Sequence, residues 1–302
     1  MKTIPAKTIL SHQKDRSYFG NDYNMNLYKG CCHGCIYCDS RSSCYQIEDF
    51  DTVRAKEDAI AILEKELRSK LKTGVIGTGS MSDPYNPFEE EYRLTRQALE
   101  LIDTYRYGIA IATKSALITR DIDILERIRK HSPVICKITI TTADDPLSSQ
   151  IEPGVDISSE RFRAIRELSR AGIYTGILMT PVLPYLTDTG DNVLELIHRA
   201  KDSGAKFIYA LFGMTLRQGQ REYYYGRLNS LYPDRQLVKQ YNTQYGDTYE
   251  CHSPRAKELK TLFETECERL GILYRMEDII EAYKGSYGYE QLSLFDIKAD
   301  NL

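Results

Sequence analysis

The chain has 302 residues, 42% of them hydrophobic and 27% charged, which is enough for one large globular domain or two smaller ones. Its net charge of −3 gives no overall attraction to nucleic acid, so such a partner would need a local basic surface. No apolar run is long enough to span a bilayer, and MKTIPAKTILSHQ at the start lacks the apolar stretch of a signal peptide. We therefore expect a cytoplasmic protein without a membrane partner.

Residues 25 to 213 alternate between short β-branched runs and amphipathic stretches. The β-branched runs predict six strands: Met25–Lys29, Gly74–Gly79, Gly108–Thr113, Val134–Thr141, Ile173–Thr180 and Lys206–Phe212. Apolar residues at helical spacing predict helices between them, over residues 54–71, 121–130, 159–170 and 191–202. This order favours a parallel sheet with right-handed crossovers, and the repeats are too few for a closed eight-stranded barrel. The predicted fold class is α/β: a partial, open, six-stranded parallel β/α barrel with a small C-terminal extension.

Changes in composition and hydrophobic pattern along the chain predict four segments. They are an N-terminal extension (1–24), the barrel core (25–213), a tyrosine-rich helical extension (214–285) with a helix from about Pro254 to Leu270, and a flexible tail (286–302). In folds of this class the chemistry lies at the carboxyl ends of the strands. Polar and Gly/Pro-rich motifs follow the predicted strands there, namely a cysteine-rich loop, GTGSMSDPYNPFE, TKS, TTADD and TPVLPYLTD.

Five of the eight cysteines lie in one stretch, YKGCCHGCIYCDSRSSC, over residues 28–44. In a reducing cytosol, clustered cysteines bind metal more often than they form disulfides. Cys31, Cys35 and Cys38 have the spacing C-x3-C-x2-C, which can turn three thiolates towards one centre. Three thiolates on a 4Fe–4S cluster leave one iron open for a substrate or cofactor.

A closed zinc site with four ligands is the alternative for this loop. Cys31 or Cys32 would then join Cys35, Cys38 and Cys44, with His33 as a further candidate ligand.

These motifs together resemble a known family. The C-x3-C-x2-C loop, with Tyr37 before its last cysteine, is similar to that of the radical S-adenosylmethionine (SAM) enzymes. GCCHGCIYC, SMSDPYNPFE, LTR, TKS, IEPG and TPVLP, in this order, resemble the spore photoproduct lyase-like branch, also called DNA repair photolyase-like proteins. The resemblance covers about residues 20–215 and implies a radical SAM core with lyase-like chemistry.

The resemblance implies a 4Fe–4S cluster held by Cys31, Cys35 and Cys38, with SAM bound to the open iron. One electron from a reductant such as flavodoxin or ferredoxin would then cleave SAM to a 5′-deoxyadenosyl radical. The other cofactor-binding residues implied are Tyr37, Gly77, Gly79, Ser82, Asp83 and Lys114, the glycines because they permit close approach.

Each of these side chains also has a structural explanation. Tyr37 could pack in the core, Asp83 could form a turn, and Lys114 could be a solvated strand-end charge. Glu152, Arg161 and Asp188 also match the branch, and they fit loop or helix-cap charges equally well.

Two positions depart from true spore photoproduct lyases. Those enzymes have a hydrogen-donating cysteine just before a Thr-Ser-Asp segment, and Ser80 stands there in this chain. They also have a tyrosine after the last cluster cysteine, where this chain has Asp39. A serine O–H bond is too strong to donate a hydrogen atom readily to a carbon radical. We therefore expect a different substrate, with the catalytic donor unassigned and Cys44 and Tyr37 as candidates.

Two segments suggest a nucleic-acid partner. The tail sequence QLSLF resembles the pentapeptide by which bacterial repair proteins bind the DNA sliding clamp, and it could equally fold back onto the barrel. The implied partner-binding residues are Gln291, Leu292, Leu294 and Phe295. Cations alternate with aromatic rings in the extension, where the candidate nucleic-acid contacts are Arg217, Arg221, Tyr223, Tyr224 and Arg227. A packing surface that closes the barrel would explain that segment as well.

The sequence therefore predicts a radical SAM enzyme that acts on nucleic acid in DNA repair or modification. Two alternatives stay open: the same chemistry on a protein or metabolite, and a non-enzymatic metal-binding adaptor of the clamp.

Overall fold

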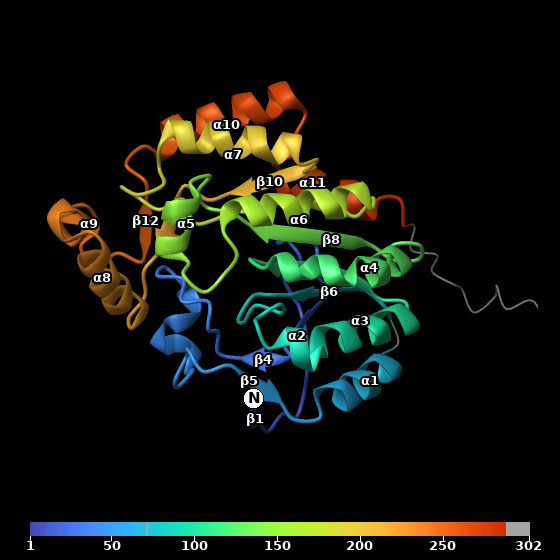
Figure 1. Ribbon diagram of the computed structural model, residues 1–302. Helices are drawn as coiled ribbons and strands as arrows, with labels where there is room; N and C mark the ends of the chain where they lie inside the picture. Colours follow the sequence, from blue (N-terminus) through green and yellow to red (C-terminus); the bar gives the residue numbers. More distant parts are fainter. Residues whose placement is uncertain (71, 288–302) are drawn as a thin grey trace, which may run out of the picture.

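A seven-stranded sheet of order β10-β9-β8-β7-β6-β3-β2 forms the centre of the protein. The computed structural model describes residues 1–70 and 72–287 (Figure 1). Six neighbouring strands are parallel, and β2 alone joins this sheet antiparallel. Within the described residues the edge strands β10 and β2 do not pair, so the predicted open, six-stranded parallel β/α barrel is confirmed. The strands are β2 (Leu10–His12), β3 (Tyr23–Met25), β6 (Val75–Thr78), β7 (Gly108–Thr113), β8 (Val134–Thr139), β9 (Tyr174–Met179) and β10 (Phe207–Ala210).

Both faces of this sheet are buried, which explains its nearly continuous apolar strands. On β7, Ile109 and Ile111 belong to the large core beneath the helices. Ala110 of β7 and Ile135 of β8 belong to a smaller core on the concave face. The period of two along each strand therefore separates a helix-facing layer from a barrel-interior layer.

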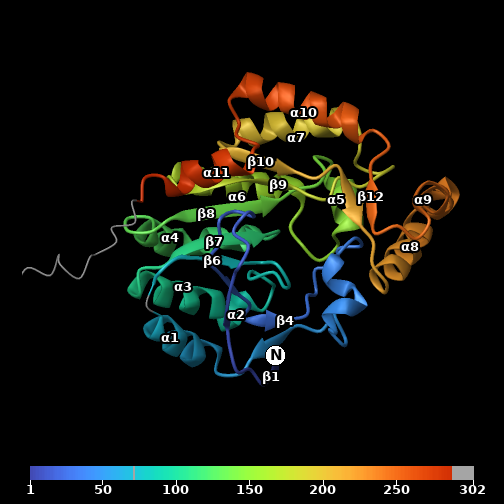
Figure 2. The same cartoon turned by 180° about the vertical axis from the view of Figure 1, so that it is seen from behind.

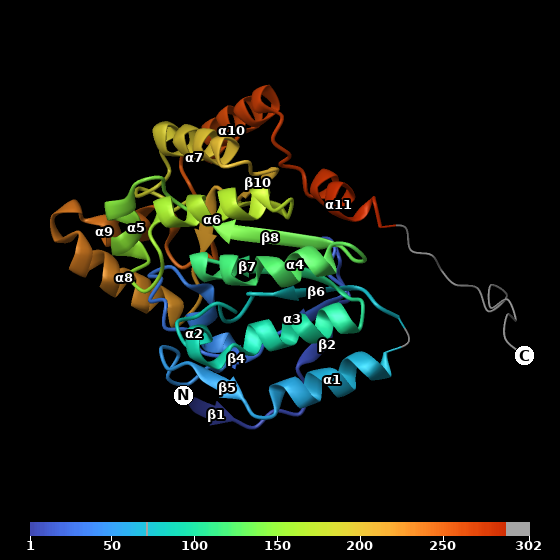
Figure 3. The same ribbon diagram turned by 45° about the vertical axis from the view of Figure 1, so that its right-hand side comes forward.

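Helices cover the convex face of the sheet in chain order (Figures 1 and 3). They are α1 (Ala59–Ser69), α2 (Glu89–Tyr92), α3 (Leu94–Thr104), α4 (Ile122–Ile128), α6 (Ser158–Arg170) and α7 (Gly190–Asp202). The short helix α5 (Asp145–Ile151) stands at the carboxyl ends of the strands, where its Ile151 packs with the cysteine-rich loop (Figure 1). The helices predicted over 121–130, 159–170 and 191–202 are confirmed, and so is the later one, which is α10 (Ala256–Leu270). The helix predicted over 54–71 begins only at Ala59, because Arg54–Lys56 form a strand instead. No helix was predicted at α3, although its buried Ala98, Leu99 and Ile102 have helical spacing.

The predicted first strand, Met25–Lys29, is divided in two by the structure. Only β3 belongs to the large sheet, where it pairs with β6. β4 (Tyr28–Lys29) pairs instead with β5 (Arg54–Lys56), which also pairs with β1 (Lys2–Ile4). The chain leaves the sheet after Met25 because the carbonyl of Leu27 accepts from Lys56 N, at 3.0 Å. This exit carries the cysteine-rich loop over the carboxyl ends of the strands.

The residues after 213 are more ordered than their sequence indicated. α8 (Gln220–Leu231) and α9 (Leu237–Tyr245) lie at the carboxyl ends of the strands, and α11 (Met276–Lys284) lies towards the other end (Figure 3). β11 (Gly213–Thr215) pairs with β12 (Glu250–His252). Short 3-10 turns occupy Asp39–Arg41, Ser43–Tyr45, Ala116–Asp121 and Pro233–Arg235. No helix in the described part of the chain is both long and apolar enough to cross a membrane.

The N-terminal segment crosses the concave face of the sheet (Figure 2). Its Phe19 is fully buried and packs against Phe207 and Tyr209 of β10. The Tyr283 hydroxyl on α11 donates to the Phe19 carbonyl at 2.5 Å. Phe19 thus joins the N-terminal segment, β10 and the last helix in one core.

We expect the Phe19→Ala variant to lose about 3–5 kcal/mol of unfolding free energy, because truncation leaves a cavity among these rings. Urea denaturation followed by circular dichroism measures the change. Tyr249→Ala is the control, since Tyr249 is 43% exposed and should give a small change. Equal midpoints for Phe19→Ala and the unsubstituted protein would contradict this account of the core.

Candidate active site

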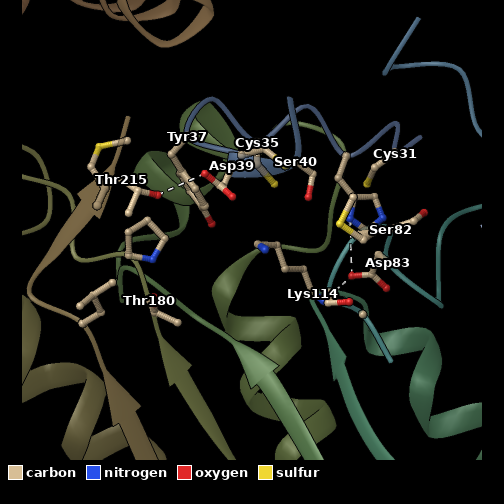
Figure 4. Close-up of a pocket in the computed structure, with 18 residues that line it drawn as sticks. Cys31, Cys35, Tyr37, Asp39, Ser40, Ser82, Asp83, Lys114, Thr180 and Thr215 are labelled. Atoms are coloured by element: carbon tan, nitrogen blue, oxygen red, sulfur yellow. Dashed lines mark hydrogen bonds and ion pairs between the residues drawn. The ribbon is translucent and has the colours of Figure 1, made fainter. Parts of the chain in front are cut away.

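A cavity of about 260 Å³ lies at the carboxyl ends of the strands, between the sheet and the cysteine-rich loop (Figure 4). The loop contributes Cys31, Cys35, Tyr37 and Cys38. The strand ends contribute Ser80, Ser82 and Asp83 after β6, Lys114 after β7, Thr180 and Pro181 after β9, and Leu211 after β10. The labelled side chains of loop and strands point into one shared space. The structure therefore brings together most of the residues that the sequence singled out.

Backbone contacts fix the shape of the cysteine-rich loop. Gly30 has a φ of +82°, and a Cβ there would lie 2.4 Å from the Thr52 carbonyl oxygen, so glycine is required. Cys31 N donates to the Phe50 carbonyl at 2.8 Å, and Ile36 N donates to the Ile151 carbonyl at 2.9 Å. These bonds tie the loop to two distant segments, so its cysteines are held in place by the fold.

Two of the motif cysteines, Cys31 and Cys35, lie in an environment that disfavours free thiolates. Burial raises the pKa of the Cys31 thiol to about 12 and raises the pKa of Cys35 well above its usual value. A bound metal supplies the positive charge that ionises such thiols. The donor set therefore fits a metal group better than it fits reactive free cysteines.

The same cysteines do not converge tightly. Among the residues described, no three His, Cys, Asp or Glu side chains are close enough together to hold a single metal ion. Zinc requires thiolate sulfurs within about 2.3 Å of one point. Three thiols spread around one cavity instead fit a group with several metal atoms. Cys44, a ligand in the alternative zinc site, is exposed and does not line the cavity.

Asp83 connects the ends of β6 and β7. Its Oδ1 accepts from the Thr113 hydroxyl at 2.6 Å and from Tyr85 N at 2.9 Å, and its Oδ2 accepts from Lys114 N at 2.8 Å. His33 Nδ1 of the cysteine-rich loop lies 3.6 Å from Oδ2. Burial lowers the pKa of His33, so this contact joins a neutral ring to the carboxylate. Asp83 thus shapes the cavity wall through bonds within the chain.

Among the described residues, Lys114 is the Lys or Arg side chain that lines the cavity. Burial by itself lowers the pKa of its ammonium, but the surrounding Cys35, Glu152 and Asp83 outweigh that effect and raise it. The Lys114 Nζ also lies 5.7 Å from the centre of the Tyr37 ring. Lys114 therefore stays protonated and brings a fixed positive charge to the cavity, where it can bind an anionic group.

The Tyr37 hydroxyl is held by a buried network of charged side chains. The Tyr37 hydroxyl donates to Glu152, and the second carboxylate oxygen of Glu152 lies 2.6 Å from Arg161 Nη2. Arg161 is fully buried and also donates to the carbonyls of Thr139 and Asp156, at 2.9 and 2.7 Å. Burial raises the pKa of Glu152, but Arg161 and Lys114 outweigh it, so the pKa lies below its usual value. Glu152 and Arg161 are not simple loop or cap charges, because they fix the ring that lines the cavity.

Gly77 of β6 and Gly79 just after this strand differ in their positions. Gly79 lines the cavity with a φ of +90°, and a Cβ there would lie 2.0 Å from the Ala112 carbonyl. Gly77 does not line the cavity, and a Cβ there would meet Asn21 Nδ2 at 2.3 Å. The requirement for glycine at position 77 thus comes from the N-terminal segment. Ser82 does line the cavity, with its hydroxyl donating to the Gly30 carbonyl at 2.6 Å.

The candidate nucleic-acid residues have divergent roles. Tyr224 is fully buried, and its hydroxyl is 2.9 Å from that of Tyr241, so the packing interpretation is correct for Tyr224. Arg221 donates to the carbonyls of Gly246 and Thr248, at 2.7 Å each, and holds the extension together. Tyr223 lies beneath the Arg41 guanidinium at 3.9 Å.

Arg217 and Arg227 are half-buried. Arg217 Nη1 donates to Cys44 Sγ at 3.1 Å, and hydrogen bonds from Ser42 and Arg217 lower the pKa of the Cys44 thiol. This position outside the cavity makes Cys44 a poor hydrogen donor for a substrate bound there. Asp188 also lies away from the cavity, where it accepts from the Ser253 hydroxyl at 2.6 Å. The tail residues 291–295 lie outside the described residues.

The far side of the cavity was only partly expected from the sequence. The motif TPVLPYLTD, expected to follow the fifth strand, contributes Thr180 and Pro181. Leu211, Met214 and Thr215 also line the cavity, but no motif was assigned to the end of the sixth strand, and the last two lie beyond the predicted core boundary at residue 213. The antiparallel pairing of β11 with β12 could not be predicted, because the paired residues, such as Met214 and Cys251, are far apart in the sequence.

The described fold and cavity agree with comparisons with known proteins. The family model for the radical SAM superfamily matches residues 25–200, and the chain therefore belongs to this superfamily. Its members are enzymes that use a 4Fe–4S cluster and SAM and need a reductant. The expectation of an enzyme with these cofactors is thus confirmed, and the non-enzymatic adaptor is not.

The curated relatives carry little functional description. An uncharacterized protein of Mycobacterium tuberculosis is 29% identical over 249 residues, which is 80% of this chain and 72% of that protein. An uncharacterized protein of Methanocaldococcus jannaschii is 33% identical over 172 residues, 56% of this chain and 63% of that protein. A Pseudomonas phage M6 protein named radical SAM Nalpha-GlyT isomerase is 27% identical over 149 residues, 49% of this chain and 30% of that protein.

Solved structures of spore photoproduct lyase have the same fold. A tyrosine-to-phenylalanine variant aligns with a TM-score of 0.66 and 16% identity, over 90% of this chain and 80% of that one. The lyase complexed with dinucleoside spore photoproduct aligns with a TM-score of 0.64 and 17% identity, over 88% and 78%. The expected lyase-like fold is therefore confirmed.

We expect Glu152→Gln to lower the unfolding free energy at pH 7 by about 3–5 kcal/mol, because it leaves the Arg161 charge buried without its partner. The matched control is Glu160→Gln, which removes an exposed partner of Arg163 on the same helix and should cost less than about 1 kcal/mol. Urea denaturation measures both.

The pH dependence gives a second check. The folded pKa of Glu152 lies below its ordinary value of 4.5, so its stabilisation is present above that pH and is lost as pH falls through the folded pKa. The difference in unfolding free energy between the unsubstituted protein and Glu152→Gln should therefore become smaller as the pH falls below the folded pKa of Glu152. If Glu152→Gln and Glu160→Gln lowered the unfolding free energy by the same amount at pH 7, the structural role of Glu152 would be contradicted.

Proposed function

We propose that this chain is a radical SAM enzyme that acts on nucleic acid, in the repair or modification of DNA, and that it is not a true spore photoproduct lyase. The observation that carries the proposal is the shared cavity, where three cysteines, Lys114 and Ser80 meet at the strand ends.

Cys31, Cys35 and Cys38 are the residues that would hold the cluster. When bound there, a 4Fe–4S cluster supplies the electron that cleaves SAM to a 5′-deoxyadenosyl radical. Lys114 contributes the positive charge that can receive the carboxylate of SAM, while Tyr37 closes one wall of the cavity. Gly79 lets a ligand approach the backbone of β6, since it carries no side chain. Ser82 and Asp83 hold the wall in place through their bonds to Gly30, Thr113 and the Lys114 amide.

Nucleic acid is favoured as the substrate by the structural neighbours. The lyase complexed with a dinucleoside aligns over 88% of this chain, which includes the carboxyl-terminal residues beyond the family match. Arg217 and Tyr223 lie against Cys44 and Arg41 of the cysteine-rich loop and keep part of their surface exposed, where a bound strand could contact a cation and an aromatic ring.

The cavity argues for a reaction other than that of the lyase. Ser80 is exposed and lines the cavity at the position that the resemblance assigns to the lyase's hydrogen-donating cysteine. Among the described residues, the cysteines that line the cavity are Cys31, Cys35 and Cys38, and all three are assigned to the cluster. A product radical would therefore have no free thiol in this cavity from which to regain a hydrogen atom.

The proposal requires one protein partner, an electron donor. A flavodoxin or ferredoxin would supply the electron. The DNA sliding clamp stays a prediction from the tail sequence alone.

We expect Cys35→Ala to abolish the visible absorbance of the anaerobically reconstituted protein and to lower its bound iron, because Cys35 is one of three proposed ligands. Cys44→Ala is the matched control in the same loop region and should keep its colour and iron. Retained absorbance in Cys35→Ala, or loss in both variants, would contradict the ligand assignment.

We expect the reconstituted protein to form 5′-deoxyadenosine from SAM and dithionite, and to form it faster when DNA is present. Chromatography measures the product with DNA, with a protein extract and without addition. The assignment as an enzyme requires that 5′-deoxyadenosine forms with DNA, with the extract or without addition. Stimulation by the extract and not by DNA would overturn the choice of nucleic acid.

A further inference from the structure

The backbone next to Cys38 is held by a glutamine of the extension that follows the barrel core. Gln220 is the first residue of α8, and it is almost completely buried, with 1% of its surface exposed. Its Nε2 donates to the Tyr37 carbonyl at 3.0 Å. That carbonyl belongs to the peptide group between Tyr37 and Cys38, and this group is planar. The hydrogen bond therefore fixes the orientation of the peptide from which the Cys38 side chain extends.

The first part of the cysteine-rich loop is held by other segments. Cys31 N donates to the Phe50 carbonyl at 2.8 Å, and Ile36 N, next to Cys35, donates to the Ile151 carbonyl at 2.9 Å. Neither bond involves the extension. Cys31 and Cys35 are thus placed by segments that precede the extension in the chain.

The position of Cys38 depends on a different support. In the described part of the chain, hydrogen bonds to the backbone of Tyr37 and Cys38 come from Cys35, Arg41 and Gln220. Cys35 and Arg41 belong to the cysteine-rich loop itself, so their bonds shape the loop without attaching it to anything else. Gln220 is therefore the residue that attaches this stretch of backbone to another part of the fold.

The amide of Gln220 is itself fixed on all sides. Its Nε2 also donates to the Thr215 carbonyl at 2.7 Å, and its Oε1 accepts from Arg217 N at 2.9 Å. Both N–H groups and the carbonyl oxygen of the side chain thus have partners, which is the full use that a buried amide can make of its polar atoms. The side chain cannot turn away from Tyr37 without breaking its bonds within the extension.

Further contacts bring the extension against the same end of the loop. Ser43 N donates to the Gln218 carbonyl at 3.0 Å, and the Thr215 hydroxyl donates to Asp39 Oδ1 at 3.3 Å (Figure 4). The loop and the extension also contribute to one buried apolar core, whose members include Ile36, Tyr37, Met214, Leu216 and Tyr224. The extension is therefore packed and hydrogen-bonded to the segment that carries Cys38.

We propose that Gln220 is a positioning residue of the cluster site, because its amide holds the peptide between Tyr37 and Cys38 and so places Cys38 with the other two cysteines. The extension then completes the cluster site in addition to covering the open barrel. Side chains that hold metal ligands in place affect how tightly the metal is retained. This inference rests on the proposed function, which assigns Cys38 to the cluster.

The first test measures how fast the anaerobically reconstituted protein loses iron to the chelator bathophenanthroline. We expect Gln220→Met to lose iron about tenfold faster than the unsubstituted protein, because Cys38 is no longer held in place. Gln218→Met is the matched control two residues away. The Gln218 side chain is exposed, and its bond to Ser43 uses the backbone carbonyl, so this variant should lose iron at the unsubstituted rate.

The second test separates a local effect on Cys38 from a general loosening of the fold. The metal-free, full-length protein is treated with iodoacetamide, and mass spectrometry follows the alkylation of each cysteine. We expect Gln220→Met to speed up alkylation of Cys38 about fivefold, because one buried hydrogen bond is lost, and to leave Cys31 unchanged. Gln220→Asn keeps a buried amide but is too short to bridge the Thr215 and Tyr37 carbonyls. It should show the same selective increase, and it replaces Gln220→Met if that variant does not fold.

The outcomes also separate this inference from the proposed function. If the unsubstituted protein takes up no iron, both the proposed function and the role of Gln220 are overturned. If it takes up iron and Gln220→Met loses it no faster than Gln218→Met, the role of Gln220 is overturned and the proposed function stands. Equal acceleration of alkylation at Cys31 and Cys38 would make Gln220 a general structural residue, which also overturns the inference.

Discussion

The carboxylate of Asp83 is the interaction on which the shape of the cavity depends. It accepts hydrogen bonds from the Thr113 hydroxyl and from the backbone of Tyr85 and Lys114, so it joins the loop after β6 to the end of β7. The carboxylate needs donors because it is buried, and these three donors would otherwise lack a partner at the end of the sheet. Asp83 therefore fixes both the wall of the cavity and the point from which Lys114 extends.

A second buried charge is stabilised on the opposite side of the cavity. Arg161 and Glu152 lie in the interior, where each would be unfavourable without the other. Together they hold the hydroxyl of Tyr37, and Ile151 next to Glu152 accepts from the Ile36 amide. The cysteine-rich loop is thus supported from the sheet side by Asp83 and from the helix side by Glu152. This arrangement explains how a loop with almost no secondary structure can present three cysteines to one cavity.

The N-terminal segment fills the concave face of the sheet. Phe19 packs at the base of the barrel against Phe207 of β10 and Tyr283 of α11. The same segment places Asn21 against Gly77, so the close approach at that glycine is made by the chain itself. The open barrel is therefore closed at its base, and its cavity lies at the carboxyl ends of the strands.

The alternation of strands and helices, the cysteine motif and the positions of the polar loops could be predicted from the sequence, because they follow from local period and spacing. The family resemblance and the departure at Ser80 could also be seen there. The sequence offered Tyr224 as a nucleic-acid contact and gave no sign that Lys137 is buried. In the folded protein Tyr224 packs against Tyr241, and Lys137 of β8 lies against Phe19 of the N-terminal segment. Burial of this kind depends on which distant segments pack together, and no local pattern encodes it.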